Sequence, residues 1–191
     1  SIAKKENKPC ALLIKKGFFM DYKFQSTTFY DRPLCRERAI EIIIDHLSEL
    51  DIVVSTTGVA SRELFEYREK LNSGHEKDFL TVGGMGHASQ IALGIALQKK
   101  NRQVYCLDGD GALIMHMGSL AINASMNCSN FKHIIFNNSA HDSVGGQPTV
   151  GDKINISSIA LNAGYQWAKT VSKELDIKLA LSEMKSTKGL A

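Results

Sequence analysis

The sequence lacks several features that would assign it to a specialised class of protein. No apolar run approaches the about 20 residues that a membrane-spanning helix needs, and no signal peptide, internal repeat or low-complexity stretch is present. The four cysteines show no CxxC spacing, which argues against a metal ribbon or a redox pair. We therefore expect reduced thiols in a cytoplasmic protein without a membrane partner. The cysteines are Cys10, Cys35, Cys106 and Cys128.

The charge balance is also close to even. The net charge of +3 comes largely from lysines near the start of the chain, between Lys4 and Lys23. Neither a basic helix nor a ladder of aromatic residues accompanies them, so we expect no nucleic-acid partner.

The pattern that is present predicts an α/β domain. A length of 191 residues suits one domain with a full core. Residues 1–30 are predicted to be a linker or N-terminal lead, and residues 31–191 the domain. Apolar runs that suit strands alternate with helical patterns, which predicts a parallel sheet with helices on both faces. Strands are predicted at 52–54, 79–82, 104–107, 131–136 and 165–171, and helices at 32–50, 61–71, 86–100, 112–125, 154–162 and 173–184.

Two polar motifs follow two of these predicted strands. Gly109-Asp110-Gly111 follows the run 104–107, and Asn137-Asn138 follows the run 131–136. Parallel strands end at the same edge of a sheet, so these side chains are expected to meet there. A carboxylate, an amide oxygen and a nearby backbone carbonyl suit magnesium (Mg²⁺), with phosphate oxygens and water completing its shell. Glycines beside a helix start allow close approach of a phosphate. The motifs therefore predict a cradle for a diphosphate and a metal.

Gly-Asp-Gly followed at this distance by paired asparagines resembles the motif of thiamine diphosphate-dependent enzymes. The resemblance implies the thiamine diphosphate-binding fold, with thiamine diphosphate and Mg²⁺ as cofactors. It implies that Asp110, Asn138 and the Ala140 carbonyl hold the metal, and that Gly83 and Met85 contact the aminopyrimidine and bend the cofactor. The glycine-bearing loops after the strands supply the remaining contacts. The residues implied to bind the cofactor are Thr57, Gly58, Gly83, Met85, Asp110, Gly111, Asn138 and Ala140.

One residue departs from the family pattern. Ser139 stands where the family often has glycine, so a positive φ at this turn would strain the backbone. The stretch 139–153 is expected to be a loop that acts as an active-site lid. His141 lies in it and is a candidate for contacting substrate.

Longer stretches narrow the resemblance. Residues 55–65, 85–94 and 137–149 look like the corresponding parts of phosphonopyruvate decarboxylases. Sulfopyruvate decarboxylases, which act on the sulfonate analogue, are the nearest alternative. The resemblance implies decarboxylation of phosphonopyruvate to phosphonoacetaldehyde, so the substrate is expected to be a small anionic 2-keto acid.

The family also has a second α/β domain, which binds the pyrimidine and carries the glutamate that activates it. No region of this sequence is free to form that domain, and the family's active site usually lies across a subunit interface. We therefore expect a homo-oligomer in which the catalytic glutamate lies on a pyrimidine-binding domain of another subunit. The lysine-rich start resembles an interdomain linker, and the end stops short of an expected final strand. We therefore expect the chain to be the diphosphate-binding part of a larger enzyme and to be inactive alone.

Two other classes share parts of the pattern. Asp108-Gly109-Asp110-Gly111 resembles the nucleophile loop of haloacid-dehalogenase-like phosphohydrolases, but Ala112 stands where that family expects threonine. An EF-hand calcium loop would need a ligand at Ala112 and a closing glutamate, and it has neither. A binding fragment without activity of its own is the non-enzymatic alternative.

Overall fold

The computed structural model describes residues 2–20 and 33–191. Residues 1 and 21–32 lie outside this description. They include Lys23, the last ten residues of the expected lead and Arg32, where the expected helix 32–50 begins. The chain divides into two units, Ser1–Asp31 and Arg32–Ala191. In the first unit, α1 (Ile2–Glu6) is followed by irregular chain, and none of residues 2–20 is buried.

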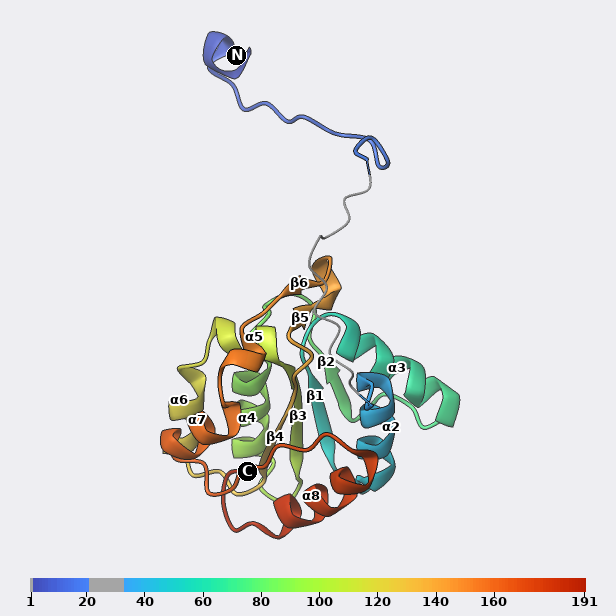
Figure 1. The fold of residues 1–191 in the computed structure, drawn as a ribbon, viewed down its shortest axis with the longest axis vertical. Helices are drawn as coiled ribbons and strands as arrows, with labels where there is room; N and C mark the ends of the chain where they lie inside the picture. The colour runs from blue at the N-terminus through green and yellow to red at the C-terminus, as the bar shows by residue number, and fades with distance from the viewer. Residues whose placement is uncertain (1, 21–32) are drawn as a thin grey trace. The chain divides into compact units, whose positions relative to one another are not determined.

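A parallel sheet forms the centre of the second unit (Figure 1). The strand order is β2-β1-β3-β4, and every neighbouring pair is parallel. The inner strands β1 and β3 are buried almost throughout, as expected for a sheet that is covered on both faces. The strands are β1 (Ile52–Ser55), β2 (Asp78–Leu80), β3 (Val104–Gly109) and β4 (Phe131–Phe136).

Helices cover both faces of this sheet, so the predicted α/β architecture is confirmed (Figure 1). Successive residues of a strand point to opposite faces. Val54 and Cys106 accordingly join the larger core cluster, whereas Val53 and Leu107 join the other. One face carries α2 (Arg36–His46), α3 (Val59–Leu71) and α8 (Glu174–Ser186); the other carries α4 (Ala88–Gln98), α6 (Ser119–Ser125) and α7 (Ile156–Ala163).

Two predicted elements differ in the structure. The expected helix 112–125 is divided into α5 (Asp110–Met115) and α6, because His116 leaves the helical region at φ −135° and ψ 44°. The expected strand 165–171 is wrong. The final residues lie beside β4 instead, where the His133 amide donates to the Ala191 carbonyl at 2.8 Å. Gln166 donates to the Leu190 carbonyl at 3.0 Å, one step further from the sheet.

The expected loop 139–153 contains more regular structure than the sequence indicates. β5 (Ala140–His141) and β6 (Gln147–Pro148) pair in antiparallel fashion. The chain reverses direction between β5 and β6 at Gly145 and Gly146, which both have positive φ. Short 3₁₀ turns occupy Asp142–Val144 and Gly151–Lys153.

No helix among residues 2–20 and 33–191 combines the length and the apolar character that crossing a bilayer requires.

A buried lysine joins the sheet to the end of the chain. Lys132 in β4 is 0% exposed, and its Nζ donates to the Gly189 carbonyl at 3.2 Å and to the Thr187 carbonyl at 3.4 Å. No carboxylate within the described residues pairs with it. Burial disfavours the charged amine and lowers the pKa of Lys132 to about 8.

This lysine predicts a pH-dependent stability. Above the folded pKa, the unfolded chain binds the proton that the folded chain has released, so stability rises as the pH increases. We expect the free energy of unfolding to rise by about 1–3 kcal/mol between roughly pH 8 and pH 10, with little Lys132-dependent slope below pH 8. Urea unfolding across this range measures it. Lys132→Met should lose the rise, and Lys178→Met, which changes an exposed lysine of α8, should keep it. The same rise in Lys132→Met would contradict this origin.

Candidate functional site

The predicted motifs meet at the carboxyl edge of the sheet. Gly109 in β3 lies opposite Phe136 in β4, so Asp110 and Asn137 follow from neighbouring positions. Asp110 is only 2% exposed, and its Oδ2 accepts a hydrogen bond from the Thr149 hydroxyl. In the described part of the chain, no lysine or arginine forms an ion pair with Asp110. The site therefore contains a buried carboxylate that no lysine or arginine of the described residues neutralises.

Asn137 organises the turn after β4. Its Nδ2 donates to the Gly151 carbonyl at 2.9 Å, and its Oδ1 accepts from the Ser139 amide and hydroxyl at 3.2 Å. Ser139 has φ +56°, the left-handed conformation that would favour glycine here. These bonds hold the serine in that conformation and bring Gly151 next to Asp110.

Asn138 faces the other side of the turn. Its Oδ1 accepts from the Ala140 amide at 3.1 Å, and its Nδ2 donates to Asp142 Oδ2 at 2.6 Å. An amide oxygen has two lone pairs, so one remains for a further partner. Asn138 is thus bonded to the Ala140 backbone, and both residues line the same pocket.

An arginine that the sequence analysis did not identify completes this side. Arg36 Nη1 donates to Asp142 at 2.9 Å, and its Nε and Nη2 donate to the two oxygens of Glu63 at 2.8 and 3.0 Å. Hydrogen bonding to Glu63 raises the pKa of Arg36 above its ordinary value. The guanidinium is therefore a permanent cation at the edge of the site.

These residues surround a pocket. Its lining includes both predicted and unpredicted residues, and Arg36 is the only lysine or arginine among the described residues that line it. Two of the residues expected to bind cofactor, Gly58 and Gly83, do not line the pocket. Gly58 packs against Ser143, which is part of the lining. Gly83 donates its amide to Thr57 Oγ1 at 3.3 Å. The expected residues in the lining are Thr57, Met85, Asp110, Gly111, Asn138, Ala140 and His141.

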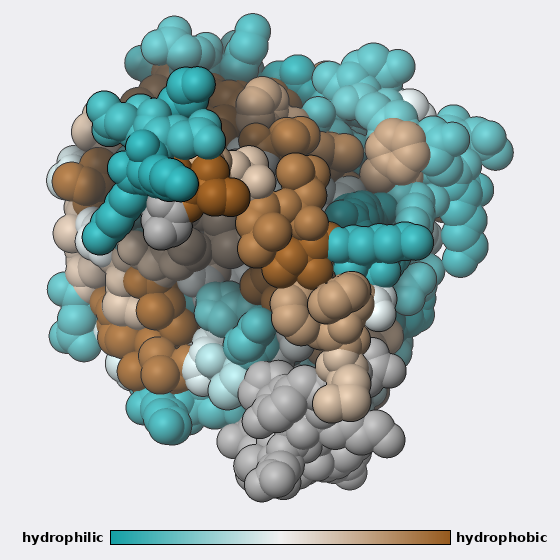
Figure 2. Space-filling model, turned by 90° about the horizontal axis from the view of Figure 1, so that it is seen from above, coloured by the Kyte–Doolittle hydropathy of each residue, from teal (hydrophilic) through white to brown (hydrophobic). Residues whose placement is uncertain are grey.

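His141 lies close against the glycine of the first motif. A Cβ on Gly111 would stand 2.5 Å from His141 Cε1 and 2.6 Å from its Nδ1. Any side chain at position 111 would therefore displace the imidazole. Met115 and Val150, which line a second hollow together with His141, expose apolar side chains. A space-filling view shows hydrophobic residues among hydrophilic ones on one side of the molecule (Figure 2).

The donor atoms of the pocket suit a cation and an anionic ligand. Asp110, Asn138 and the Ala140 carbonyl all offer oxygen atoms, the ligands that Mg²⁺ prefers. Thr56 lines the same pocket, and its buried Oγ1 has no hydrogen-bond partner among the described residues. A buried hydroxyl without a partner costs free energy, which a ligand oxygen would recover. The residues present thus suit a diphosphate bound with a divalent cation.

Sequence reasoning assigned no role to Arg36, Thr56 or Thr149, and it used Asn137 only as part of the paired motif. Thr56 directly precedes Thr57, and Asn137 directly precedes Asn138, both of which were expected to bind the cofactor or the metal. Arg36 and Thr149 carry no local signal, because each acts on a residue far away in the sequence.

The close packing of Gly151 gives a test of the geometry. A Cβ on this glycine would lie 2.6 Å from Asp110 Oδ2, so Gly151→Ala must displace the carboxylate or its neighbours. We expect a loss of about 1–3 kcal/mol in the free energy of unfolding. Gly118→Ala is the matched control, since nothing lies within 4 Å of its Cβ and its φ of −56° suits alanine. Urea unfolding compares the two, and equal losses would contradict the described packing.

Comparison with known proteins shows which family this chain resembles. Residues 56–191 match the family described as thiamine pyrophosphate enzyme, C-terminal TPP binding domain. Phosphonopyruvate decarboxylase from Streptomyces hygroscopicus is 36% identical over 159 residues, which is 83% of this chain and 38% of that protein. Sulfopyruvate decarboxylase subunit beta from Methanocaldococcus jannaschii is 37% identical over 150 residues, 76% of this chain and 77% of that protein.

Solved structures share the fold at low sequence identity. Benzoylformate decarboxylase from Polynucleobacter necessarius superposes with a TM-score of 0.67 at 19% identity, covering 85% of this chain and 33% of that one. A thiamine diphosphate-dependent 4-hydroxybenzoylformate decarboxylase from Rhodococcus jostii gives 0.68 at 17% identity, covering 88% and 33%. The chain therefore belongs to the thiamine pyrophosphate enzyme family and matches its C-terminal TPP binding domain.

Proposed function

We propose that this chain binds thiamine diphosphate and Mg²⁺ and supplies the diphosphate and metal half of the active site of a 2-keto acid decarboxylase. The observation that carries the proposal is Asp110, a buried carboxylate that no lysine or arginine of the described residues pairs with, beside further oxygen donors. Membership of the family supports it independently.

The proposed roles follow the arrangement of the pocket. Asp110, Asn138 Oδ1 and the Ala140 carbonyl would hold Mg²⁺. Gly111, with Thr57 and Gly58, would leave room for the diphosphate, and the unpaired Thr56 hydroxyl offers it a further hydrogen bond.

The base of the cofactor would lie against the loop after β2. Gly83 is exposed and has φ +71°, and its carbonyl is the proposed acceptor for the 4′-amino group. Met85 lines the pocket, where a flexible thioether suits an apolar wedge.

Thiamine diphosphate, when bound, supplies the electron sink that decarboxylation of a 2-keto acid requires. The residues of this chain would hold it in position and balance its charge. The metal would offset Asp110 and the diphosphate together. Arg36 is already paired with Glu63 and Asp142, so it would contribute hydrogen bonds rather than net positive charge. His141 would close the pocket above Gly111 and is the proposed contact to the substrate.

For the substrate we propose phosphonopyruvate, converted to phosphonoacetaldehyde and carbon dioxide, with sulfopyruvate as the alternative. A relative named phosphonopyruvate decarboxylase and one named sulfopyruvate decarboxylase subunit beta are similar to this chain at nearly equal identity. Arg36 lines the pocket, and the guanidinium N–H groups that do not bond Glu63 and Asp142 suit a second anionic group on the 2-keto acid. Aldehyde formation from phosphonopyruvate, sulfopyruvate and pyruvate by the complete enzyme would rank the three.

The partner we propose is a pyrimidine-binding domain that carries the activating glutamate, contributed by another subunit of an oligomer. The chain spans 38% of the Streptomyces hygroscopicus relative but 77% of a relative that is named as a subunit. Both lengths are consistent with a domain that functions together with another. We accordingly expect no decarboxylation by this chain alone.

Calorimetric titration with thiamine diphosphate, with and without Mg²⁺, tests the binding proposal. Wild type should bind in a magnesium-dependent manner, and Asp110→Asn should bind at least about tenfold more weakly because a charged ligand is lost. The control is Glu66→Gln, which removes an exposed carboxylate of α3. Unchanged binding in Asp110→Asn would exclude this cradle. If wild type does not bind alone, the same titration on the native assembly decides.

A further inference from the structure

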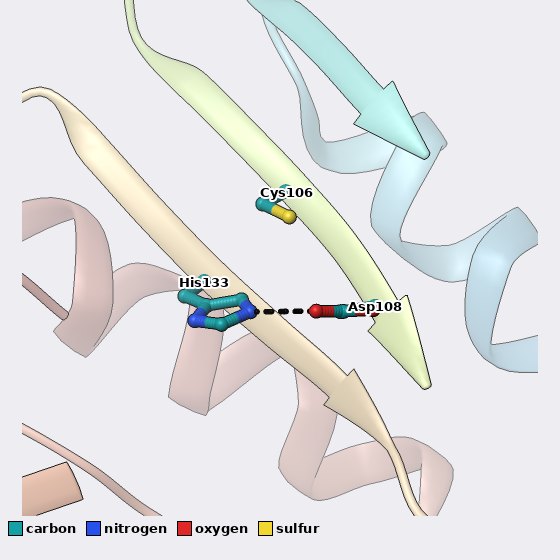
Figure 3. A group of neighbouring side chains, drawn as sticks. All are labelled: Cys106, Asp108 and His133. Atoms are coloured by element: carbon teal, nitrogen blue, oxygen red, sulfur yellow. Dashed lines mark hydrogen bonds and ion pairs between the residues drawn. The ribbon is translucent and has the colours of Figure 1, made fainter. Parts of the chain in front are cut away.

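A chain of buried hydrogen bonds lies beneath the Gly109–Asp110 turn. Asp108 and His133 extend from neighbouring strands β3 and β4, toward one another and close to Cys106 (Figure 3). The Asp108 and His133 side chains are 1% and 0% exposed. Asp108 Oδ2 lies 3.4 Å from His133 Nε2, and Asp108 Oδ1 accepts the Gly109 amide at 2.9 Å. One carboxylate thus connects the histidine to the backbone of the turn.

The chain continues into the helices that cover this face. His133 Nδ1 lies 3.1 Å from the Tyr165 hydroxyl, which accepts from Asn123 Nδ2 at 3.2 Å. Asn123 Oδ1 in turn accepts from Gln90 Nε2 at 2.6 Å. The links connect α4, α6 and the segment after α7 to the strands of the sheet.

The direction of donation can be assigned. Burial raises the pKa of the Tyr165 hydroxyl, so it keeps its proton. Asn123 already donates to the tyrosine oxygen, and the remaining hydroxyl hydrogen has His133 Nδ1 as its acceptor among the described residues. His133 must then carry its own hydrogen on Nε2, facing Asp108. Every link from Gln90 onward donates toward the carboxylate, an order in which hydrogen bonds strengthen one another.

The same three side chains also resemble a metal site, since the possible ligand atoms of Cys106, Asp108 and His133 lie within 4.8 Å of one another. Two observations disfavour that function. Both ring nitrogens of His133 already take part in hydrogen bonds. Burial also raises the pKa of the Cys106 thiol well above its ordinary value, which disfavours the thiolate that a metal binds.

We propose that His133 is a positioning residue for the metal ligand Asp110. By donating to Asp108 it fixes the carboxylate that holds the Gly109 amide, and this sets the backbone from which Asp110 projects. The role rests on the proposed function, because it assumes that Asp110 binds the cation. Groups that orient metal ligands from behind commonly affect affinity by about 10- to 100-fold.

The first experiment examines the hydrogen bonds without any substitution. A long-range ¹H–¹⁵N spectrum of histidine-labelled full chain reports which ring nitrogen carries the hydrogen. His133 should be neutral with its hydrogen on Nε2. A hydrogen on Nδ1, or on both nitrogens, would overturn the assigned order and the proposal with it.

The second experiment measures cation affinity, by titrating Mn²⁺ as a probe for Mg²⁺ in the presence of thiamine diphosphate, on the native assembly. His133→Leu should weaken Mn²⁺ binding about tenfold or more. His133→Gln, whose amide can donate from a position near the lost Nε2, should recover most of the affinity. Cys106→Ala changes the same cluster outside the hydrogen-bond chain and should keep wild-type affinity even if it lowers stability.

The outcomes separate this inference from the function on which it rests. Wild type that binds no cation would overturn the proposed function, and with it the role of His133. Wild type that binds, with His133→Leu binding equally well or Cys106→Ala losing as much affinity as His133→Leu, would overturn the positioning role alone. If His133→Leu does not fold, the comparison of His133→Gln with Cys106→Ala and the wild-type tautomer still decide.

Discussion

The parallel register between β3 and β4 is the constraint on which the site depends. Gly109 and Phe136 are the last paired residues of the two strands, so both polar motifs leave the sheet at the same level. A shift of one residue would turn the alternating side chains to the wrong faces. Phe131 and Val104, fully buried and opposite each other at the start of the pair, make such a shift costly. The position of Asp110 is thus set by hydrophobic packing at the far end of the strands.

The carboxylates at this edge are balanced in different ways. Asp142 and Glu63 share the guanidinium of Arg36, whereas Asp110 receives only a hydroxyl donor from Thr149 within the described residues. A buried carboxylate without a cation is unfavourable unless something else compensates it. Arg36 is thus already balanced by two carboxylates, whereas the charge of Asp110 remains to be compensated, which is where the proposed cation would bind.

Local and periodic features of the fold could be predicted from the sequence, and long-range contacts could not. The strands and most helices follow from hydrophobic periodicity, and the motifs at the strand ends follow from the parallel topology. The strand expected at 165–171 has the right composition, but the last residues of the chain lie beside β4 in its place. Arg36 reaches Asp142 across 106 residues of sequence, and no pattern within α2 indicates that contact.

The Asp110 turn is held from two sides by residues of different kinds. Above it, the loop after β4 contributes Thr149 and Gly151, which are partly exposed or lie beside exposed residues. Below it, Asp108 and His133 lie in the core among strands and helices. Local opening has a low cost in a surface loop and approaches the cost of global unfolding in a core. We therefore expect the loop to open more readily than the backbone beneath Asp110, so that a proposed metal ligand at Asp110 would stay oriented if the loop moved.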